Sequence, residues 1–441
     1  MFLGLIKSVY HMKSVKNIIY MLSVQLVNYA FPLITIPIVA RAFGPEKIGV
    51  INYIAAIVAY FVLVVNYGFN YTGVRRFTRN KDKKNEIFSV IFFCQFILFF
   101  ICSIFFIFFI FTINDFKDNF WLSILTFSAC ASALFTQNWF LQANNDFKFL
   151  AKISFLSKLI SFILILFFIK NSSDVIFYVA IVNVVGLIVS ITVFFITIYK
   201  YNISMFVPNL TDCFLYLKDD RYIFFSSIIT SLYTTTGIVL LGSLGSKIDV
   251  GYYSSAQKLI DVCRAVVLIP ISQVIFPILS EKFGKDISSG ISVVVKIMPV
   301  FFFISASCLL FLNVFSFLIV KIIFGEGFEP VAPLLSILSF GLFFVFYGVM
   351  IGGQIMLNLG MDKAFLNIQV FVSIFSLVIN AALIPHWGAE VTAVVWSLSE
   401  MVITIYQILY LRKKGFVIIS LGVINPFNII KSVKYVLKKD S

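Results

Sequence analysis

Residues 87–112 read IFSVIFFCQFILFFICSIFFIFFIFT and carry no charged side chain. A helix needs about 20 consecutive apolar residues to cross the hydrocarbon core of a bilayer, and this run is long enough to do so. Similar runs lie at 17–40, 48–69, 120–141, 153–169, 175–199, 222–245, 251–280, 295–320, 330–357, 364–385 and 389–411. Because continuous apolar runs of this length satisfy their backbone hydrogen bonds in lipid as helices, the sequence predicts an all-α polytopic membrane protein with about 12 transmembrane helices.

Composition and charge distribution agree with this class. Hydrophobic residues make up 61% of the chain and charged residues 12%, whereas soluble domains are about 25% charged. The net charge of +14 does not indicate nucleic-acid binding, because about 25 of the 34 Lys and Arg residues lie at the N-terminus, in the even-numbered gaps between runs and in the C-terminal tail. The odd-numbered gaps hold about 6. The positive-inside rule therefore predicts that both termini are cytoplasmic.

Several chemistries are excluded by what the sequence lacks. The outer gaps are short, for example 41–47 and 386–388, so a membrane enzyme that processes polymers outside the cell has no loop to hold its catalytic groups. Residues 242–247, GSLGSK, lack the spacing and the Ser or Thr that a nucleotide-binding loop requires. The two His are far apart and the six Cys show no CxxC spacing. We expect a transporter without catalytic residues, cofactor or metal.

An internal repeat organises the runs. Residues 43–53 follow the first run and residues 244–253 follow the seventh, and both place a short turn, an acidic residue and a Gly before an aromatic-bearing helix. Six runs per repeat is an even number, so the halves have the same orientation, as in parallel-repeat transporters. The sequence predicts two parallel six-helix bundles. Their expected ranges are 1–200 and 222–411, with a cytoplasmic linker at 201–221 and a basic amphipathic cytoplasmic tail at 412–441.

Polar residues fall at helical spacing inside equivalent runs of the two halves. In the first run Gln25, Asn28 and Tyr29 are three and four residues apart and share one face. Small hydroxyl residues also mediate ordinary helix packing, so both interpretations remain open for the seventh run. The candidate cavity-lining residues are Gln25, Asn28, Tyr29, Asn52, Asn66, Thr230, Thr234 and Gln257.

Ionisable residues inside the runs are the strongest candidates for function, because such groups are costly at membrane depth unless paired or hydrated. Lys258, Asp261 and Arg264 are three residues apart, so each cation can pair with the central carboxylate. They form either a structural ion network or a cavity for an anionic ligand. Lys158 is interpreted as snorkelling to the inner interface. Glu400 is interpreted as a proton or cation site, or as an interhelical hydrogen-bond partner.

The chain resembles a known family along nearly its whole length. Residues 41–49, RAFGPEKIG, resemble the Arg-x-Leu-Gly-Pro-Glu-x-x-Gly signature of Wzx-type polysaccharide flippases, which export O-antigen or capsule repeat units. These belong to the multidrug/oligosaccharidyl-lipid/polysaccharide (MOP) exporter superfamily. The segments 137–143, 250–258, 324–328 and 387–389 fit as well. Phe43 stands where Leu is commoner, and Ala143 where Gly often follows.

The resemblance implies a MATE/MOP-like fold, with two bundles around a central cavity lined largely by the first, second, seventh and eighth helices. It also implies a flippase of the bacterial cytoplasmic (inner) membrane. Such a flippase moves an undecaprenyl-pyrophosphate-linked oligosaccharide to the outer leaflet by alternating access, for O-antigen or other surface polysaccharide assembly. Lys258 and Arg264 then hold the anionic head group and Asp261 pairs with them, with Arg41, Arg75 and Arg76 as further candidates. A proton or sodium gradient acting through Asp261 or Glu400 stays open.

The implied partners are the lipid-linked oligosaccharide and membrane lipids, together with a polysaccharide polymerase, a chain-length regulator or a glycosyltransferase that docks on the tail. Three alternatives remain at this point. A multidrug or cation exporter of the same superfamily would favour an acidic cavity. A peptidoglycan-precursor (lipid II) flippase shares the fold and the chemistry. A membrane polymerase is disfavoured by the short outer gaps.

Overall fold

The computed structural model describes residues 2–416 and 418. This part of the chain is built from helices and contains no strand. It forms two compact units, Met1–Ser231 and Leu232–Ser441, and the division falls within α9. Residues 201–209 connect α8 to α9, so α9 begins within the range expected for the linker.

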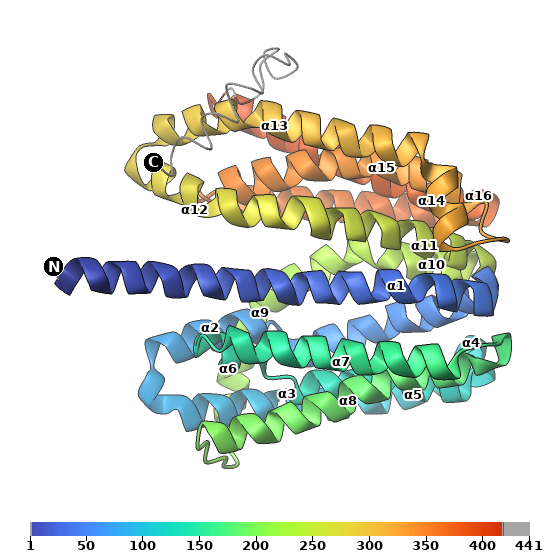
Figure 1. The fold of residues 1–441 in the computed structure, drawn as a ribbon, viewed down its shortest axis with the longest axis horizontal. Helices are drawn as coiled ribbons and strands as arrows, with labels where there is room; N and C mark the ends of the chain where they lie inside the picture. Colours follow the sequence, from blue (N-terminus) through green and yellow to red (C-terminus); the bar gives the residue numbers. More distant parts are fainter. Residues whose placement is uncertain (1, 417, 419–441) are drawn as a thin grey trace. The chain divides into compact units, whose positions relative to one another are not determined.

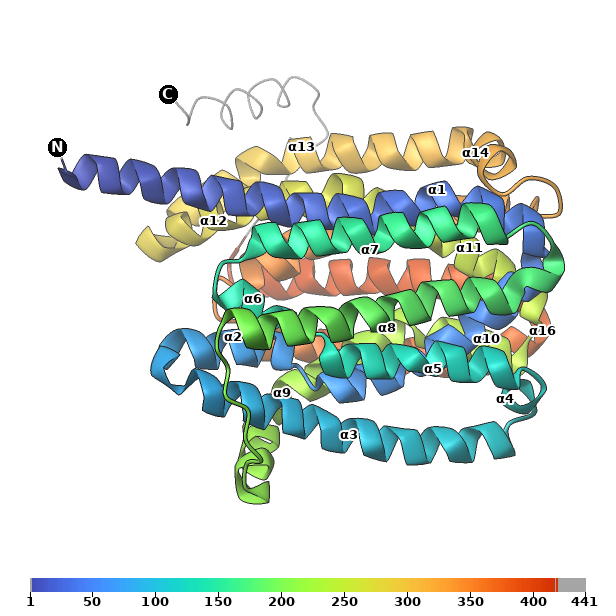
Figure 2. The same ribbon diagram turned by 60° about the horizontal axis from the view of Figure 1, so that its bottom comes forward.

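The first unit is a bundle whose long helices lie side by side. In Figure 1 and Figure 2, α3 packs along α5, and α8 packs between α5 and α7. Helix α1 contacts α3, α5 and α7. The helices are α1 (Phe2–Asn66), α2 (Phe69–Arg79), α3 (Lys84–Thr112), α4 (Asn114–Asp118), α5 (Phe120–Phe135), α6 (Asn138–Ala143), α7 (Phe147–Phe168), α8 (Val175–Lys200) and α9 (Leu210–Thr234), with single turns at Lys81–Lys83 and Ser172–Asp174.

The second unit is arranged around α15, which contacts α11, α13 and α16. Two of its helices continue into π-helical turns, a feature that is common at functional sites. The elements are α10 (Thr236–Leu244), α11 (Lys247–Cys263) with its π-helical turn η3 (Arg264–Leu268), α12 (Ile269–Lys285), α13 (Ile287–Val314), α14 (Ser316–Ile323), α15 (Val331–Gly348) with its π-helical turn η4 (Val349–Met356), and α16 (Asp362–Lys413).

Two glycines divide the longest helices. Gly44 in α1 has φ 70° and ψ 174°, and Gly388 in α16 has φ 52° and ψ −129°. These backbone conformations are accessible essentially to Gly alone, and Pro45 removes a further backbone donor after the first break. Each glycine therefore ends one membrane-crossing helix and starts the next, so α1 and α16 each carry two of the predicted apolar runs.

The described helices account for the predicted apolar runs. Eight helical segments of the described chain are long and apolar enough to span a membrane, and the bent pair α9 and α10 makes a ninth when counted as one span. The segment Asp362–Lys413 contains two runs, and Ser23–Arg79 contains one run and most of the run at 17–40. The run at 251–280 lies on α11 and α12. The prediction of an all-α polytopic membrane protein is confirmed. Within the predicted tail, 417 and 419–441 lie outside the described residues.

The segment 137–143, which is part of the family resemblance, packs in the core of the first unit. Trp139 and Phe140 on α6 are buried in an aromatic cluster with Phe88 of α3 and Phe194 of α8. The Trp139 indole donates a hydrogen bond of 2.6 Å to the side chain of Gln137. Gln137 in turn donates one of 2.7 Å to Gln95. Because these buried polar groups satisfy one another, this segment fixes α6 against α3 and α8.

Candidate substrate-binding site

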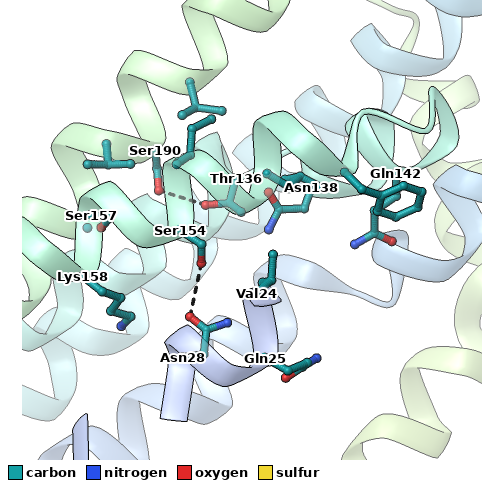
Figure 3. A pocket seen from close by; sticks show the side chains of 16 residues that line it. Val24, Gln25, Asn28, Thr136, Asn138, Gln142, Ser154, Ser157, Lys158 and Ser190 are labelled. Atoms are coloured by element: carbon teal, nitrogen blue, oxygen red, sulfur yellow. Dashed lines mark hydrogen bonds between the residues drawn. The ribbon is translucent and has the colours of Figure 1, made fainter. Parts of the chain in front are cut away.

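A polar pocket of about 470 Å³ lies in the first unit, between α1, α6 and the turn before it, α7 and α8 (Figure 3). Its size falls in the range typical of small-molecule sites. Among the described residues, the polar lining consists of amides, hydroxyls and one ammonium group and includes no carboxylate. These residues are Gln25, Asn28, Thr136, Asn138, Gln142, Ser154, Ser157, Lys158 and Ser190.

Helical spacing places the polar groups of α1 and α7 on facing surfaces. Gln25 and Asn28 are one turn apart on α1, and Ser154 and Lys158 are one turn apart on α7. The Ser154 hydroxyl donates a hydrogen bond of 3.3 Å to the Asn28 side-chain oxygen, drawn as a dashed line in Figure 3. This contact brings together residues that are 126 positions apart. Two of the predicted cavity-lining residues, Gln25 and Asn28, therefore share one pocket.

A second polar contact joins α5 to α8 at the same pocket. The hydroxyls of Thr136 and Ser190 lie 2.9 Å apart. Thr136 also donates a bond of 2.6 Å to the Ser132 carbonyl, so its hydroxyl accepts from Ser190. Hydroxyls and amides held at fixed positions can exchange their mutual hydrogen bonds for bonds to the hydroxyls of a sugar. The neutral part of the pocket therefore suits a polyhydroxylated ligand.

The ionisable residues of α11 form a separate cluster in the second unit. Arg264 Nη1 lies 3.5 Å from Asp261 Oδ1, and the two side chains are 34% and 46% exposed. Glu400 on α16 is 7% exposed and interacts electrostatically with Arg264. Asp261 interacts electrostatically with Lys258 as well. Two formal cations therefore face two carboxylates, and the surplus cation expected for the α11 triplet is balanced by Glu400.

A π-helical turn begins at Arg264, directly after the α11 segment that carries this cluster. The Gln257 side-chain oxygen is buried and accepts no hydrogen bond from described residues. Such an acceptor requires a water or ligand donor, because an unmade hydrogen bond at a buried polar atom costs about 1–3 kcal/mol. The α11 cluster is therefore polar and formally charge-balanced, and it contains a buried acceptor that the described residues leave unsatisfied.

Other predicted site residues lie outside the pocket and the α11 cluster. Arg75 and Arg76 on α2 approach Asp220 of α9 at 4.0 Å and 2.5 Å. Arg41 is exposed near the end of the first half of α1. Thr230 donates a hydrogen bond to the Ser226 carbonyl, within its own helix. Tyr29, Asn52, Asn66 and Thr234 are half-buried and do not line the pocket.

Sequence reasoning missed most of the pocket. The sequence predicts that Lys158 snorkels to the inner interface, whereas in the structure it lines the pocket together with Ser154 and Ser157. The available signal was the spacing of Ser154, Ser157 and Lys158, which places three polar groups on neighbouring faces of an apolar helix. Asn138 and Gln142 belong to the segment 137–143, which was recognised only as part of the family resemblance.

The arrangement of the helices is that of MOP-type membrane transporters. The structure is similar to "Lipid II flippase MurJ, inward closed conformation", with a TM-score of 0.72, 15% identity and coverage of 96% of this chain and 93% of that chain. It is also similar to an inward-facing multidrug resistance MATE family transporter of the MOP superfamily, with a TM-score of 0.68, 14% identity and coverage of 95% and 96%. These likenesses define the fold.

The sequence identifies the family within this class. The profile of the family described as "Polysaccharide biosynthesis protein" matches residues 14–283, and the chain belongs to this family. A relative in Escherichia coli (strain K12), named "Putative O-antigen transporter", is 25% identical over 409 residues, which cover 91% of this chain and 98% of the relative. A relative of the same name in Shigella dysenteriae is 27% identical over 282 residues, covering 63% and 70%. The predicted resemblance to Wzx-type exporters, which are transporters rather than enzymes, is confirmed.

Proposed function

We propose that this protein is a flippase that moves undecaprenyl-pyrophosphate-linked oligosaccharide repeat units from the cytoplasmic to the outer leaflet of the bacterial cytoplasmic membrane. The observation that carries the proposal is the pocket of the first unit, in a chain of the polysaccharide biosynthesis family. Its neutral polar lining matches a sugar, and its cation matches a phosphate. The relative in Escherichia coli, of which 98% is covered, bears the name "Putative O-antigen transporter".

Alternating access supplies the mechanism. Two helical units in parallel repeats can move the substrate site from one side of the membrane to the other by rocking. The polyprenyl chain stays in the bilayer, so only the sugars and the phosphates need a polar path. The neutral amide and hydroxyl groups of residues such as Asn28 and Ser154 can form hydrogen bonds with the sugar in place of the bonds that it forms with water. Both termini are proposed to be cytoplasmic, in line with the distribution of Lys and Arg.

The charge of the pocket separates this proposal from cation export. A multidrug exporter of organic cations needs carboxylates at its binding site, whereas the described lining offers Lys158 and no acidic side chain. A flippase for peptidoglycan precursors would share the phosphate and sugar chemistry, and the similarity to MurJ concerns the fold, at 15% identity. Dependence of growth on this protein would favour that second candidate.

The proposal is tested in a strain that lacks the protein. We expect lipid-linked repeat units to accumulate unpolymerised on the cytoplasmic side and surface polysaccharide to be lost, with both restored by the wild-type chain. Intact polymer with normal lipid intermediates would overturn the proposal. A partner polymerase, a chain-length regulator and coupling to a proton or sodium gradient belong to the same proposal. Dissipating either gradient separately, while the appearance of lipid-linked units in the outer leaflet is measured, identifies the driving ion.

A further inference from the structure

Lys158 is an unusual cation for its position. It lies in the middle of α7, a segment that is apolar enough to span the membrane. Among the described residues, no side chain or backbone group forms an ion pair or hydrogen bond with its ammonium group. A Lys at the centre of a transmembrane helix costs about 3 kcal/mol on insertion scales. A cation retained at this depth without a partner among the described residues indicates a ligand that supplies the negative charge.

The α11 cluster differs in this respect. Arg264 forms an ion pair with Asp261 at 3.5 Å and is attracted electrostatically by Glu400. Lys258 is attracted by Asp261. An incoming anion would compete there with two carboxylates of the protein. At Lys158 the described pocket lining contains no carboxylate, so none of its residues opposes the attraction of an anion to the ammonium group. Coulomb attraction in a partly desolvated site exceeds that in water severalfold.

We propose that Lys158 binds a phosphate oxygen of the substrate's diphosphate, and that Gln25, Asn28 and Ser154 contact the adjoining sugar. This inference rests on the proposed function of the protein and assigns the anion-binding group to α7 of the first unit. A Lys ammonium is a point charge with three rotatable donors, which suits a phosphate that enters and leaves. Figure 3 shows Lys158 and Ser154 on α7 with Asn28 on the facing helix, so one ligand can reach all three.

The same chemistry could be supplied by two sources, the diphosphate of the lipid-linked substrate or the phosphate of an ordinary membrane phospholipid. Binding of purified full-length protein to undecaprenyl pyrophosphate, with phosphatidylglycerol as competitor, distinguishes them. We expect undecaprenyl pyrophosphate to bind and a tenfold excess of phosphatidylglycerol to leave that binding within about twofold. Equal binding of both lipids, lost equally on substitution of Lys158, would assign the site to phospholipid and overturn the proposal.

Substitution on α7 tests the residue itself. Lys158→Gln is expected to weaken the binding of undecaprenyl pyrophosphate by about tenfold or more, because one charge-assisted hydrogen bond is lost. Lys158→Arg keeps the charge and should retain most of the affinity. The matched control is Lys152→Gln, which removes a cation from the same helix at an exposed position outside the pocket. Equal affinities of Lys158→Gln and Lys152→Gln would overturn the assignment.

A measurement on the unaltered chain does not depend on the folding of a variant. Acetic anhydride modifies accessible lysines, and mass spectrometry reports the modified fraction at each. Undecaprenyl pyrophosphate should protect Lys158 and leave Lys152 unprotected; equal modification of Lys158 with and without the lipid would overturn the proposal. Failure of the proposed function is recognised separately, because a deletion strain would then keep its surface polysaccharide. A deletion phenotype that Lys158→Gln fully restores would overturn only the role of Lys158.

Discussion

The guanidinium group of Arg76 on α2 lies 2.5 Å from the carboxylate of Asp220 on α9, although the two residues are 144 positions apart. The Asp220 side chain is fully buried and the Arg76 side chain is 16% exposed. The Tyr216 ring lies beneath the guanidinium, 4.0 Å from its centre. This buried pair therefore ties the first half of α9 to α2 within the first unit.

Removal of the buried carboxylate is expected to destabilise the first unit. Asp220→Asn removes the buried carboxylate that faces the mostly buried Arg76 cation and leaves it only the exposed Asp219. Breaking a buried pair typically costs about 3 kcal/mol or more. The thermal midpoint of the detergent-solubilised protein should fall clearly. Asp219→Asn is the matched control, because Asp219 lies 3.6 Å from Arg76 but is 68% exposed, and exposed pairs contribute little. Equal midpoints for the two variants would show that the pair does not stabilise the fold.

Gly44 offers a test of the backbone break in α1. A Cβ at this position would meet open space, so any destabilisation by Gly44→Ala arises from the φ of 70°. Such strain costs about 1–3 kcal/mol, and we expect a lower thermal midpoint and a lower yield of folded protein. Gly284→Ala in α12 is the control, since its Cβ also meets open space at ordinary helical geometry. That change should be neutral or slightly stabilising.

The membrane-crossing helices could be predicted because hydropathy depends on each residue's own preference for lipid or water. The break at Gly44 could be anticipated as a turn, because Gly and Pro are adjacent in the segment 41–49. The pairing of Arg76 with Asp220 could not be predicted, since it depends on the rotation and register of two helices far apart in the sequence. The same limit applies to Ser154 and Asn28, and to Glu400 beside Arg264.

Some residues in the segments that resemble the family have structural roles. Trp139 was recognised by resemblance, and it is buried with its indole bonded to Gln137. Tyr253, Ser254 and Ser255 in the segment 250–258 are likewise buried. Such positions maintain helix packing and carry little information about the substrate. The polar residues that line the pocket are few in otherwise apolar helices, so average composition and hydropathy do not reveal them and only their helical spacing does.

Asp286, between α12 and the membrane-crossing α13, provides a pH-dependent test. Its carboxylate accepts hydrogen bonds from the Ser288 hydroxyl and from the Ser289 backbone N–H, the latter at 3.1 Å. These bonds lower the pKa of Asp286 below its ordinary value. A lowered pKa in the folded state means stability that is present above the ordinary Asp pKa of about 3.9 and is lost as the pH falls through the folded value.

The comparison uses Asp286→Asn, which keeps a helix-capping side chain and removes the charge. We expect the wild-type protein to have the higher thermal midpoint near pH 6, and the difference to shrink as the pH is lowered below the ordinary Asp pKa. Thermal denaturation of both proteins between pH 6 and pH 3, in a detergent without ionisable groups, measures this difference in thermal midpoint. A difference that stays constant over this range would contradict a contribution from the ionised carboxylate.

The α11 cluster can be tested through its coupling to α16. Arg264→Gln leaves Asp261 and Glu400 without the guanidinium that both interact with, so stability and transport should both fall. Adding Glu400→Gln removes the second carboxylate and should recover part of the lost stability, with a coupling energy of about 1 kcal/mol. Lys258→Gln combined with Glu400→Gln gives a second cycle for comparison, with a cation that is attracted by Asp261 of its own helix. Additive effects of Arg264→Gln and Glu400→Gln would contradict the pairing.

The transport readout of the same variants separates a structural from a head-group role for the α11 cations. The double variant Arg264→Gln, Glu400→Gln is formally neutral at both positions, so a purely structural network predicts recovered surface polysaccharide along with recovered stability. A head-group role for Arg264 predicts that stability recovers while surface polysaccharide stays low, because the missing cation can no longer contact phosphate. Membrane levels of each variant, measured by immunoblot, normalise the polysaccharide signal. If Lys258→Gln together with Arg264→Gln leaves the normalised signal unchanged, neither cation binds the head group.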